Sequence, residues 1–247
     1  MEKQVVNEFT VEGRNAVIEA FRSGKPIDKI YILDGCQDGP VMTIKREAKK
    51  HDTLIKYVTK ERLDQMSETG KHQGVIAYTT EFKYSELEDI LSAKPDNRLI
   101  LILDGIEDPH NLGSIIRSAE CAGAHGVVIT KRRSASVTAA VVKTSAGAAE
   151  HMRIARVVNL ANAIDTLKEK GLWIAGADMD GRPMYDVDMK GGFALVIGSE
   201  GSGLSKLVKE KCDFLVSVPL KGHIDSLNAA VAGAIIMFEK NRQERGN

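Results

Sequence analysis

The stretch FALVIGSEGSGLS, Phe193–Ser205, joins a run of apolar residues to a loop that contains three glycines. A continuous apolar run is typical of a strand buried on both faces of a parallel sheet, and the segment KLVKEKC that follows has a helical pattern. Glycine loops in this place often hold phosphates, with the spacing G-x-G-x-x-G or G-x-x-x-x-G-K-[ST]. This loop has G-x-x-G-x-G instead, and Glu200 would repel a phosphate. We therefore expect a different ligand here.

Strand and helix patterns alternate throughout residues 98–247, on both sides of this loop. The expected strands cover 99–105, 126–130, 152–157, 172–177, 193–199 and 214–220, and the expected helices cover 111–123, 136–147, 159–171 and 226–245. Such alternation predicts a doubly wound α/β sheet that binds ligands at the C-terminal ends of its strands. Asn111 is suited to cap the helix that it opens. The last helix is rich in Ala and Gly, which indicates close packing against another helix or a second subunit. We take it as the candidate dimer contact, and the alternative is that it packs only within its own chain.

Residues 1–80 form a second alternating pattern, which predicts a separate, smaller α/β module. Helices are expected at 13–24, 40–52 and 60–67, and strands at 28–35, 53–59 and 74–80. Between the two modules, residues 81–97 are acidic and contain few apolar side chains. We predict an exposed linker with a short helix there, so that the domains are 1–80 and 98–247.

Composition limits the choice of function without fixing it. The 247 residues include 34 Lys and Arg and 34 Asp and Glu, so the formal net charge of zero does not by itself indicate nucleic-acid binding. Basic clusters do occur at 45–51, at 131–133 and at Arg153 with Arg156, and each alone fits a solvated surface. Cys36, Cys121 and Cys212 are isolated, as expected for reduced thiols. With no secretory signal pattern and no apolar run of about 18 residues, we expect a cytoplasmic protein.

Three loop motifs identify the large module by resemblance. They are N-x-x-x-x-x-R from Asn111, G-S-E-G-x-G-L-S from Gly198, and P-L-x-G-x-x-x-S-L-N from Pro219. In this order and at these strand ends, they resemble the SpoU (TrmH-type) RNA ribose 2′-O-methyltransferases from Arg98 onward. The segment SAGAAEH, 145–151, is similar to the cofactor-side loop of that family. The small module, which ends in HQGVIAY, resembles the substrate RNA-binding domain of the RlmB branch, which modifies a guanosine of 23S ribosomal RNA.

The resemblance implies a trefoil-knot (SPOUT) domain that binds S-adenosyl-L-methionine and works as a homodimer on ribosomal RNA, without membrane or DNA partners. The cofactor positions carried over are Gly147, Gly198, Gly201, Val218, Leu220, Ser226 and Leu227. The catalytic positions carried over are Asn111, Arg117, Glu200, Ser226 and Asn228. The family assigns the role of base to the arginine, but a guanidinium is very hard to deprotonate, so Arg117 could instead clamp a phosphate. No metal is implied, and Asp178 with Asp180 fit a turn better than a metal site.

Other functions remain open from the sequence. The same chemistry could act on transfer RNA or on another ribosomal site, and the module at residues 1–80 would distinguish these substrates. A protein of this fold could also be a non-catalytic RNA-binding assembly factor, although Arg117, Glu200 and Asn228 are all present. A dinucleotide dehydrogenase is disfavoured because no G-x-G-x-x-G follows an early strand.

Overall fold

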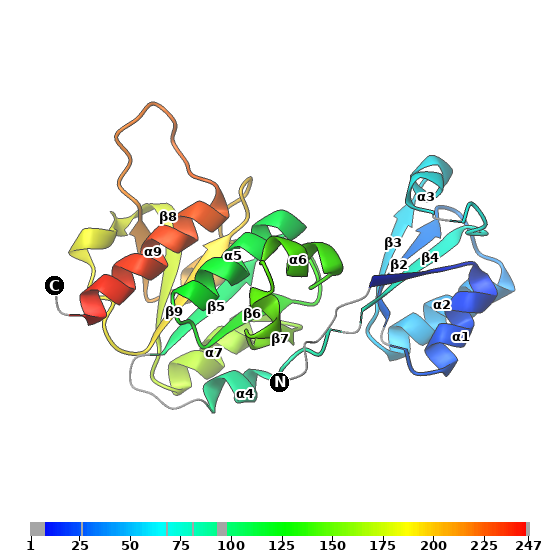
Figure 1. Cartoon of the computed structure of the whole chain (residues 1–247), viewed down its shortest axis with the longest axis horizontal. Coiled ribbons are helices and arrows are strands. Elements are labelled where there is room, and N and C mark those ends of the chain that lie inside the picture. Colours follow the sequence, from blue (N-terminus) through cyan, green and yellow to red (C-terminus); the bar gives the residue numbers. More distant parts are fainter. Residues whose placement is uncertain (1–7, 26, 68, 81, 93–97, 246–247) are drawn as a thin grey trace. The chain divides into compact units, whose positions relative to one another are not determined.

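The chain forms two compact units, residues 1–82 and 83–247, each with its own sheet (Figure 1). The structure is a computed structural model that describes residues 8–25, 27–67, 69–80, 82–92 and 98–245. Because each unit has its own sheet and helices, each is described separately below.

The first unit is a mixed sheet covered by helices. The strand order is β1 (Glu8–Glu12), β4 (Val75–Thr80), β2 (Ile27–Leu33) and β3 (Leu54–Val58), with β4 antiparallel to both of its neighbours and β2 parallel to β3. The helices are α1 (Arg14–Arg22), α2 (Gly39–Lys50) and α3 (Lys60–Met66). Val17, Ile32 and Ile44 lie in the core between α1, α2 and the sheet. The predicted elements of this unit are confirmed, and β1 is an additional strand that the pattern analysis missed.

The second unit is a fully parallel sheet within the described residues. Its strand order is β10 (Phe214–Ser217), β8 (Trp173–Pro183), β9 (Phe193–Gly198), β5 (Leu99–Asp104), β6 (Gly126–Thr130) and β7 (Ile154–Val157). The two central strands pair from Leu99 with Phe193 to Asp104 with Gly198. All of β9 is buried, as expected for an apolar strand between two layers of helices. Asp104 and Gly198 therefore end their strands side by side at one edge of the sheet.

Helices cover both faces of this sheet. On one face α4 (Leu87–Leu91), α7 (Leu160–Glu169) and α8 (Lys206–Lys211) pack against side chains such as Ile100 and Val196. Because side chains alternate along a strand, Ile197 points to the opposite face, where α5 (Pro109–Cys121), α6 (Ala139–Thr144) and α9 (Ala229–Glu244) lie. Figure 1 shows α5 and α9 side by side. Two short 3-10 turns complete the unit, η1 (Ala148–Glu150) and η2 (Met184–Asp186).

Glycine in α9 is explained by packing inside the chain. A Cβ at Gly233 would overlap the side chain of Ile197 on β9. The helix therefore approaches the sheet closely at this point. The close packing predicted for the Ala/Gly-rich helix is found within the chain, against β9 and α5, and its role as the dimer contact stays a prediction.

The start of each site helix differs by a few residues from the prediction. Asp108, not Asn111, caps α5, because its carboxylate accepts a hydrogen bond from His110 N at 2.9 Å. The last helix begins at Ala229 rather than at Ser226, and Asn228 caps it. In both cases a side-chain oxygen that accepts from the first free N–H groups decides where the helix begins.

Two further predictions were wrong in part. The acidic segment 81–97 does contain a short helix, but α4 is not exposed, since Leu87 and Ile90 are buried in the core of the second unit. Residues 81 and 93–97 lie outside the described residues. The sequence GADMDG, predicted as a turn, lies within β8. Its pairing with β10 is irregular there, because the partner on β8 shifts from Gly176 to Arg182 between two consecutive residues of β10.

Two remaining questions are whether the chain is knotted and whether a helix could span a membrane. The trefoil knot stays a prediction, because strand order does not describe how the chain is threaded. Across the described ranges, no helix has both the length and the apolar composition required to cross a bilayer.

Candidate active site

The three sequence motifs meet at one edge of the parallel sheet. The segments 105–108, 199–205 and 218–228 follow β5, β9 and β10, whose C-terminal ends lie at the same edge. Ser205 N donates a hydrogen bond of 2.7 Å to Asp104 Oδ2, which joins the end of the glycine loop to the end of β5. This is the edge at which ligands bind in doubly wound folds.

The glycine loop closes on itself. Ser199 and Gly203 exchange two main-chain hydrogen bonds of 3.2 and 2.9 Å. A Cβ at Gly198 would overlap the main chain of Gly203 and Leu204, and Gly203 has a positive φ of 63°. Gly201 has neither constraint, because nothing lies within 4 Å of its missing Cβ. Gly198 and Gly203 are thus required for the shape of the loop, whereas Gly201 leaves its main chain accessible.

Asn228 connects the three motifs through one side chain. Its Nδ2 donates to Asn111 Oδ1 at 2.9 Å and to Glu200 Oε1. Its Oδ1 accepts from Ala230 N at 3.0 Å and Val231 N at 3.2 Å, which caps α9. We call Asn111, Glu200 and Asn228 the polar bridge. It fixes the first turn of α5, the glycine loop and the start of α9 relative to one another.

The other two predicted catalytic residues lie outside this bridge. Arg117 is exposed on α5, six residues beyond Asn111, which places it about 9 Å further along the helix and roughly 120° around it. It shares an exposed side of α5 with Cys121, four residues later. Ser226 is exposed in the segment 218–228, two residues before the cap.

The predicted cofactor residues are gathered only in part. Gly198 and Gly201 belong to the glycine loop, and Gly147 lies at the start of η1 with a left-handed φ of 85°. Val218 is half-buried, but Leu220 and Leu227 expose 40% and 38% of their surface. Figure 1 shows the segment that contains them arching away from the sheet. In this conformation the apolar side chains of the third motif do not close over the glycine loop.

The titratable groups near the site do not indicate a nucleophile or a metal. Burial raises the pKa of Cys212 to about 11, so this thiol is protonated at neutral pH. Asp178 forms a 2.7 Å ion pair with Lys209. Burial is the largest single effect on Asp178 and opposes its ionisation, but the hydrogen bonds from Lys209 and Asp180 N and the charge of Lys209 together outweigh it, so the pKa of Asp178 is lowered. The described part of the chain holds no cluster of three or more His, Cys, Asp or Glu residues able to bind a metal.

Some residues that shape the site were not singled out from the sequence. Asp104 accepts a hydrogen bond from the end of the glycine loop. Thr144 on α6 packs against Gly113 of α5, where a Cβ would lie only 2.7 Å from Thr144 Cβ. An aspartate directly after an apolar strand was a usable signal for Asp104. Nothing in the local sequence signals the contact of Thr144, which depends on the packing of two helices.

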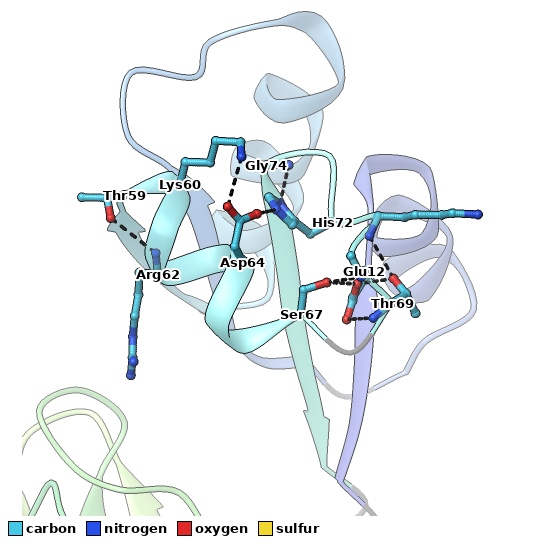
Figure 2. A network of polar contacts seen from close by, with 11 residues as sticks. Glu12, Thr59, Lys60, Arg62, Asp64, Ser67, Thr69, His72 and Gly74 are labelled. Carbon is cyan, nitrogen blue, oxygen red and sulfur yellow. Dashed lines mark hydrogen bonds and ion pairs between the residues drawn. The ribbon is translucent and has the colours of Figure 1, made fainter.

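The first unit contains a second polar network, around the segment 67–74 (Figure 2). The Glu12 carboxylate accepts hydrogen bonds from Ser67 Oγ at 2.6 Å, from Thr69 N at 3.3 Å and from Thr69 Oγ1. At the other end, His72 Nδ1 accepts from Gly74 N at 3.0 Å while Nε2 lies 2.9 Å from Asp64 Oδ1. Because Nδ1 accepts the hydrogen bond from Gly74 N, the ring proton is on Nε2, which donates a hydrogen bond to Asp64.

This network holds residues 69–74 in one shape. Hydrogen bonds from His72 and then from Lys60 lower the pKa of Asp64, so its carboxylate stays ionised and keeps both partners. Lys71 and Gln73 are exposed, and Gln73 has a positive φ of 50°. The loop therefore presents polar side chains on a fixed backbone.

Comparison with known proteins covers both units. Residues 98–238 match the model of the SpoU rRNA Methylase family, and residues 10–85 match the model described as RNA 2'-O ribose methyltransferase substrate binding. YacO of Bacillus subtilis strain 168, a protein named as a TrmH family tRNA/rRNA methyltransferase, is 46% identical over 237 residues, which are 94% of this chain and 95% of that protein.

Solved structures of related enzymes share the fold. The SpoU methyltransferase AviRb from Streptomyces viridochromogenes, in complex with AdoMet, has a TM-score of 0.62 and 27% identity over 96% of this chain and 90% of that one. The AdoMet-bound rRNA methyltransferase from Sinorhizobium meliloti has a TM-score of 0.62 and 26% identity over 96% and 87%. The expected α/β fold with a parallel methyltransferase sheet is confirmed. The chain belongs to the SpoU rRNA methylase family.

Proposed function

We propose that this enzyme transfers a methyl group from S-adenosyl-L-methionine to the ribose 2′-hydroxyl of a guanosine in 23S ribosomal RNA. The observation that carries the proposal is the polar bridge, because one asparagine connects the three loops that bear the motifs of the family. Family membership supports RNA methyl transfer, and the resemblance of the first unit to the RlmB branch supports the ribosomal guanosine. Because ribosomal RNA is its proposed substrate, we expect the enzyme to act in the cytoplasm.

The residues at the glycine loop fit S-adenosyl-L-methionine. Accessible main chain at Gly201 and the carboxylate of Glu200 suit a ligand with a positive sulfonium and no phosphate. The residues that would hold it are Gly147, Gly198, Gly201, Val218, Leu220, Ser226 and Leu227. When bound, the cofactor supplies an electrophilic methyl group. Leu220 and Leu227 are exposed here, so we expect segment 218–228 to close over the ligand and exclude water.

The task of the protein is to align the 2′-hydroxyl and to remove its proton. Alignment of this kind supplies about 7–11 kcal/mol in favourable systems, without a metal or an oxyanion hole. Asn228 holds Glu200 and Asn111 in place for that alignment. We assign Arg117 to the adjoining phosphate, where its planar guanidinium also polarises the hydroxyl, while the proton leaves to a neighbouring group or to water. The role of base is disfavoured because a guanidinium is very hard to deprotonate.

We further propose that the enzyme is a homodimer that associates through the exposed face of α5 and α9. Val231 and Phe238 expose 47% and 49% of their surface, seven residues apart on one side of α9. A cleft of about 320 Å³ lies beside Phe238, lined by Cys121, Phe238, Asn241, Arg242 and Arg245. Because Arg117 lies on the same exposed side of α5 as Cys121, a second copy on this face would bring its own surface next to Arg117.

The dimer is tested by Phe238→Glu. We expect this variant to be monomeric by light scattering, because a carboxylate at the centre of an apolar interface is left unpaired. It should keep its melting temperature within a few degrees, since Phe238 is half-exposed in the single chain. Lys170→Glu, at the exposed end of α7 on the opposite face of the sheet, is the control. A dimeric Phe238→Glu protein would contradict this interface.

The reaction itself is tested with labelled S-adenosyl-L-methionine and three substrates: unmethylated 23S ribosomal RNA, a transfer RNA transcript, and a DNA copy of the ribosomal target region. Label in the ribosomal RNA alone supports the proposal. Label in transfer RNA alone favours the alternative substrate, and tight cofactor binding without label in any nucleic acid favours an assembly factor. The DNA copy reports on the hydroxyl, since it lacks the 2′-oxygen that accepts the methyl group.

A further inference from the structure

The basic segment 131–133, which we call the basic loop, follows β6 at the active-site edge of the sheet. Thr130 pairs with Val157 at the ends of β6 and β7, and Lys131 N donates to Val157 O at 2.8 Å. Arg132 and Arg133 are exposed. Arg156, one residue before the end of β7, lies close by and adds a fourth positive charge. Arg153 and Arg156 form one basic cluster in the sequence, but Arg153 precedes β7 and therefore lies at the opposite edge of the sheet from Arg156.

The basic loop is tied to the elements that carry the candidate site. Ala135 N donates to Ile106 O at 2.7 Å, which connects it to the β5–α5 segment ahead of Asn111. The helix that follows, α6, then packs tightly on the first turns of α5, where Thr144 lies against Gly113. The positions of the basic loop and of Asn111 are therefore fixed relative to each other.

Two contacts of Tyr84 support the basic loop and the residues that follow it. The Arg156 guanidinium lies 5.3 Å from the centre of the Tyr84 ring, and Tyr84 Oη accepts a hydrogen bond of 2.9 Å from Val137 N. Arg133 has a positive φ of 53°, a conformation that costs a non-glycine residue about 1 kcal/mol or more. Glycine or asparagine would adopt it with less strain. An arginine at this position is more readily explained by what its side chain binds than by what its backbone requires.

We propose that the basic loop binds phosphates of the RNA strand beside the target nucleotide, so that the substrate runs from the end of β6 to the polar bridge. This inference rests on the proposed function, because it takes RNA as the substrate. Contacts to phosphates are independent of sequence and set the register of a nucleic acid on a protein. The basic loop would then position the RNA, while the first unit contributes selectivity for the target.

The test measures how RNA binding depends on salt in the full chain. Arg132→Gln combined with Arg133→Asn removes two charges, and asparagine tolerates the left-handed backbone. The matched control, Lys170→Gln combined with Lys190→Gln, removes two charges from exposed positions before β8 and β9, at the opposite edge of the sheet. The probe is an in-vitro-transcribed 23S ribosomal RNA domain, and a titration with S-adenosyl-L-methionine alone reports on the folded site.

We expect the arginine variant to bind RNA about tenfold more weakly near 0.1 M salt, with a log–log salt slope shallower by about 1–2, because each phosphate contact contributes about 0.7–0.9 to that slope. Cofactor affinity and melting temperature should match the wild type. The control should stay within about twofold of the wild type. Arg132→Lys with Arg133→Lys should keep the slope, since it keeps the charges.

An unchanged slope in the arginine variant, or an equal loss in the control, would overturn the inference. Wild-type protein that binds no RNA would also overturn it. The proposed function fails separately: if the slope falls as expected but the wild type methylates no RNA, the basic loop binds RNA and the assigned reaction is wrong. If methylation keeps the same KM for RNA in the arginine variant, the reaction stands and the role of the basic loop is wrong.

Discussion

Asn228 has two roles that a substitution separates. Its Oδ1 caps α9, and its Nδ2 forms the polar bridge to Asn111 and Glu200. Serine is nearly as good a cap as asparagine, but its single hydroxyl cannot also donate to two distant oxygens. We expect Asn228→Ser to keep the melting temperature within a few degrees and to lower kcat for RNA methylation by about 10- to 100-fold, a range typical for residues that align substrates.

Asn228→Ala is the matched control for this prediction. It loses the cap as well as the bridge, so it should lose about 1 kcal/mol of stability in urea unfolding in addition to the activity. Serine and alanine variants with equal stability would show that the cap is unimportant. A serine variant with wild-type kcat would show that the polar bridge has no part in the reaction.

The glycine loop allows a second comparison at single residues. A Cβ at Gly198 would overlap main-chain atoms, whereas the space beside Gly201 is open. We expect Gly198→Ala to lose about 2–4 kcal/mol of stability, because main-chain atoms cannot move aside as a side chain can. Gly201→Ala should fold normally but bind S-adenosyl-L-methionine at least about tenfold more weakly in calorimetry, since the alanine side chain covers main chain that is exposed in the wild type. Normal cofactor affinity in Gly201→Ala would remove this residue from the cofactor site.

At the scale of elements, the end of α9 is held by a buried carboxylate. Glu239 accepts hydrogen bonds from Arg242 at 2.8 and 2.9 Å and from Gln243 at 2.9 Å. The Arg242 contact is the main reason why the pKa of Glu239 lies below the 4.5 of an unfolded glutamate. Because the folded pKa is lowered, this contribution to stability is present above pH 4.5 and is lost as the pH falls below it.

Glu239→Gln should therefore be less stable than the wild type at pH 7, and the gap should narrow between about pH 5 and pH 3. The measurement is the urea midpoint at several pH values. Glu210→Gln is the control, since Glu210 is exposed and lies 4.0 Å from Lys206, and its gap should be small at every pH. A gap for Glu239→Gln that stays constant down to pH 3 would contradict the assignment.

Much of the element order was predictable from sequence, and the reasons are local. The apolar run 99–103 predicted β5, and the glycine loop marked the end of β9. The positions of Gly203 and Gly198 reflect one positive φ and one close approach of the main chain, both of which favour glycine. Residue patterns therefore located these two loops of the candidate site.

The rest depends on contacts between distant segments. The capping role predicted for Asn111 was wrong, because Asp108, three residues earlier, takes the cap. The side chain of Asn111 instead accepts a hydrogen bond from Asn228. The helix α4 was predicted to be exposed because its acidic neighbours dominate the composition, yet Leu87 and Ile90 suffice to bury one side. The short β1 was missed because its pairing partner, β4, lies more than 60 residues away.

At the scale of the whole molecule, the two units have separate cores and should have separable roles. Residues 83–247 contain all predicted cofactor and catalytic positions, so this fragment should fold and bind S-adenosyl-L-methionine with the affinity of the full chain. It should lose most of its activity on 23S ribosomal RNA, because the unit that matches the substrate-binding model is missing. Full activity of the fragment on ribosomal RNA would show that the first unit does not select the substrate.

The central claim is tested most directly by locating the methyl group. Unmethylated 23S ribosomal RNA is incubated with the enzyme and S-adenosyl-L-methionine, and alkaline hydrolysis then reveals phosphodiesters that resist cleavage, since a methylated 2′-oxygen cannot attack the adjoining phosphate. The account predicts one protected bond, on the 3′ side of a guanosine, that is absent with Arg117→Lys although that variant still binds the cofactor. Label on a base with no protected bond, or normal protection with Arg117→Lys, would contradict it.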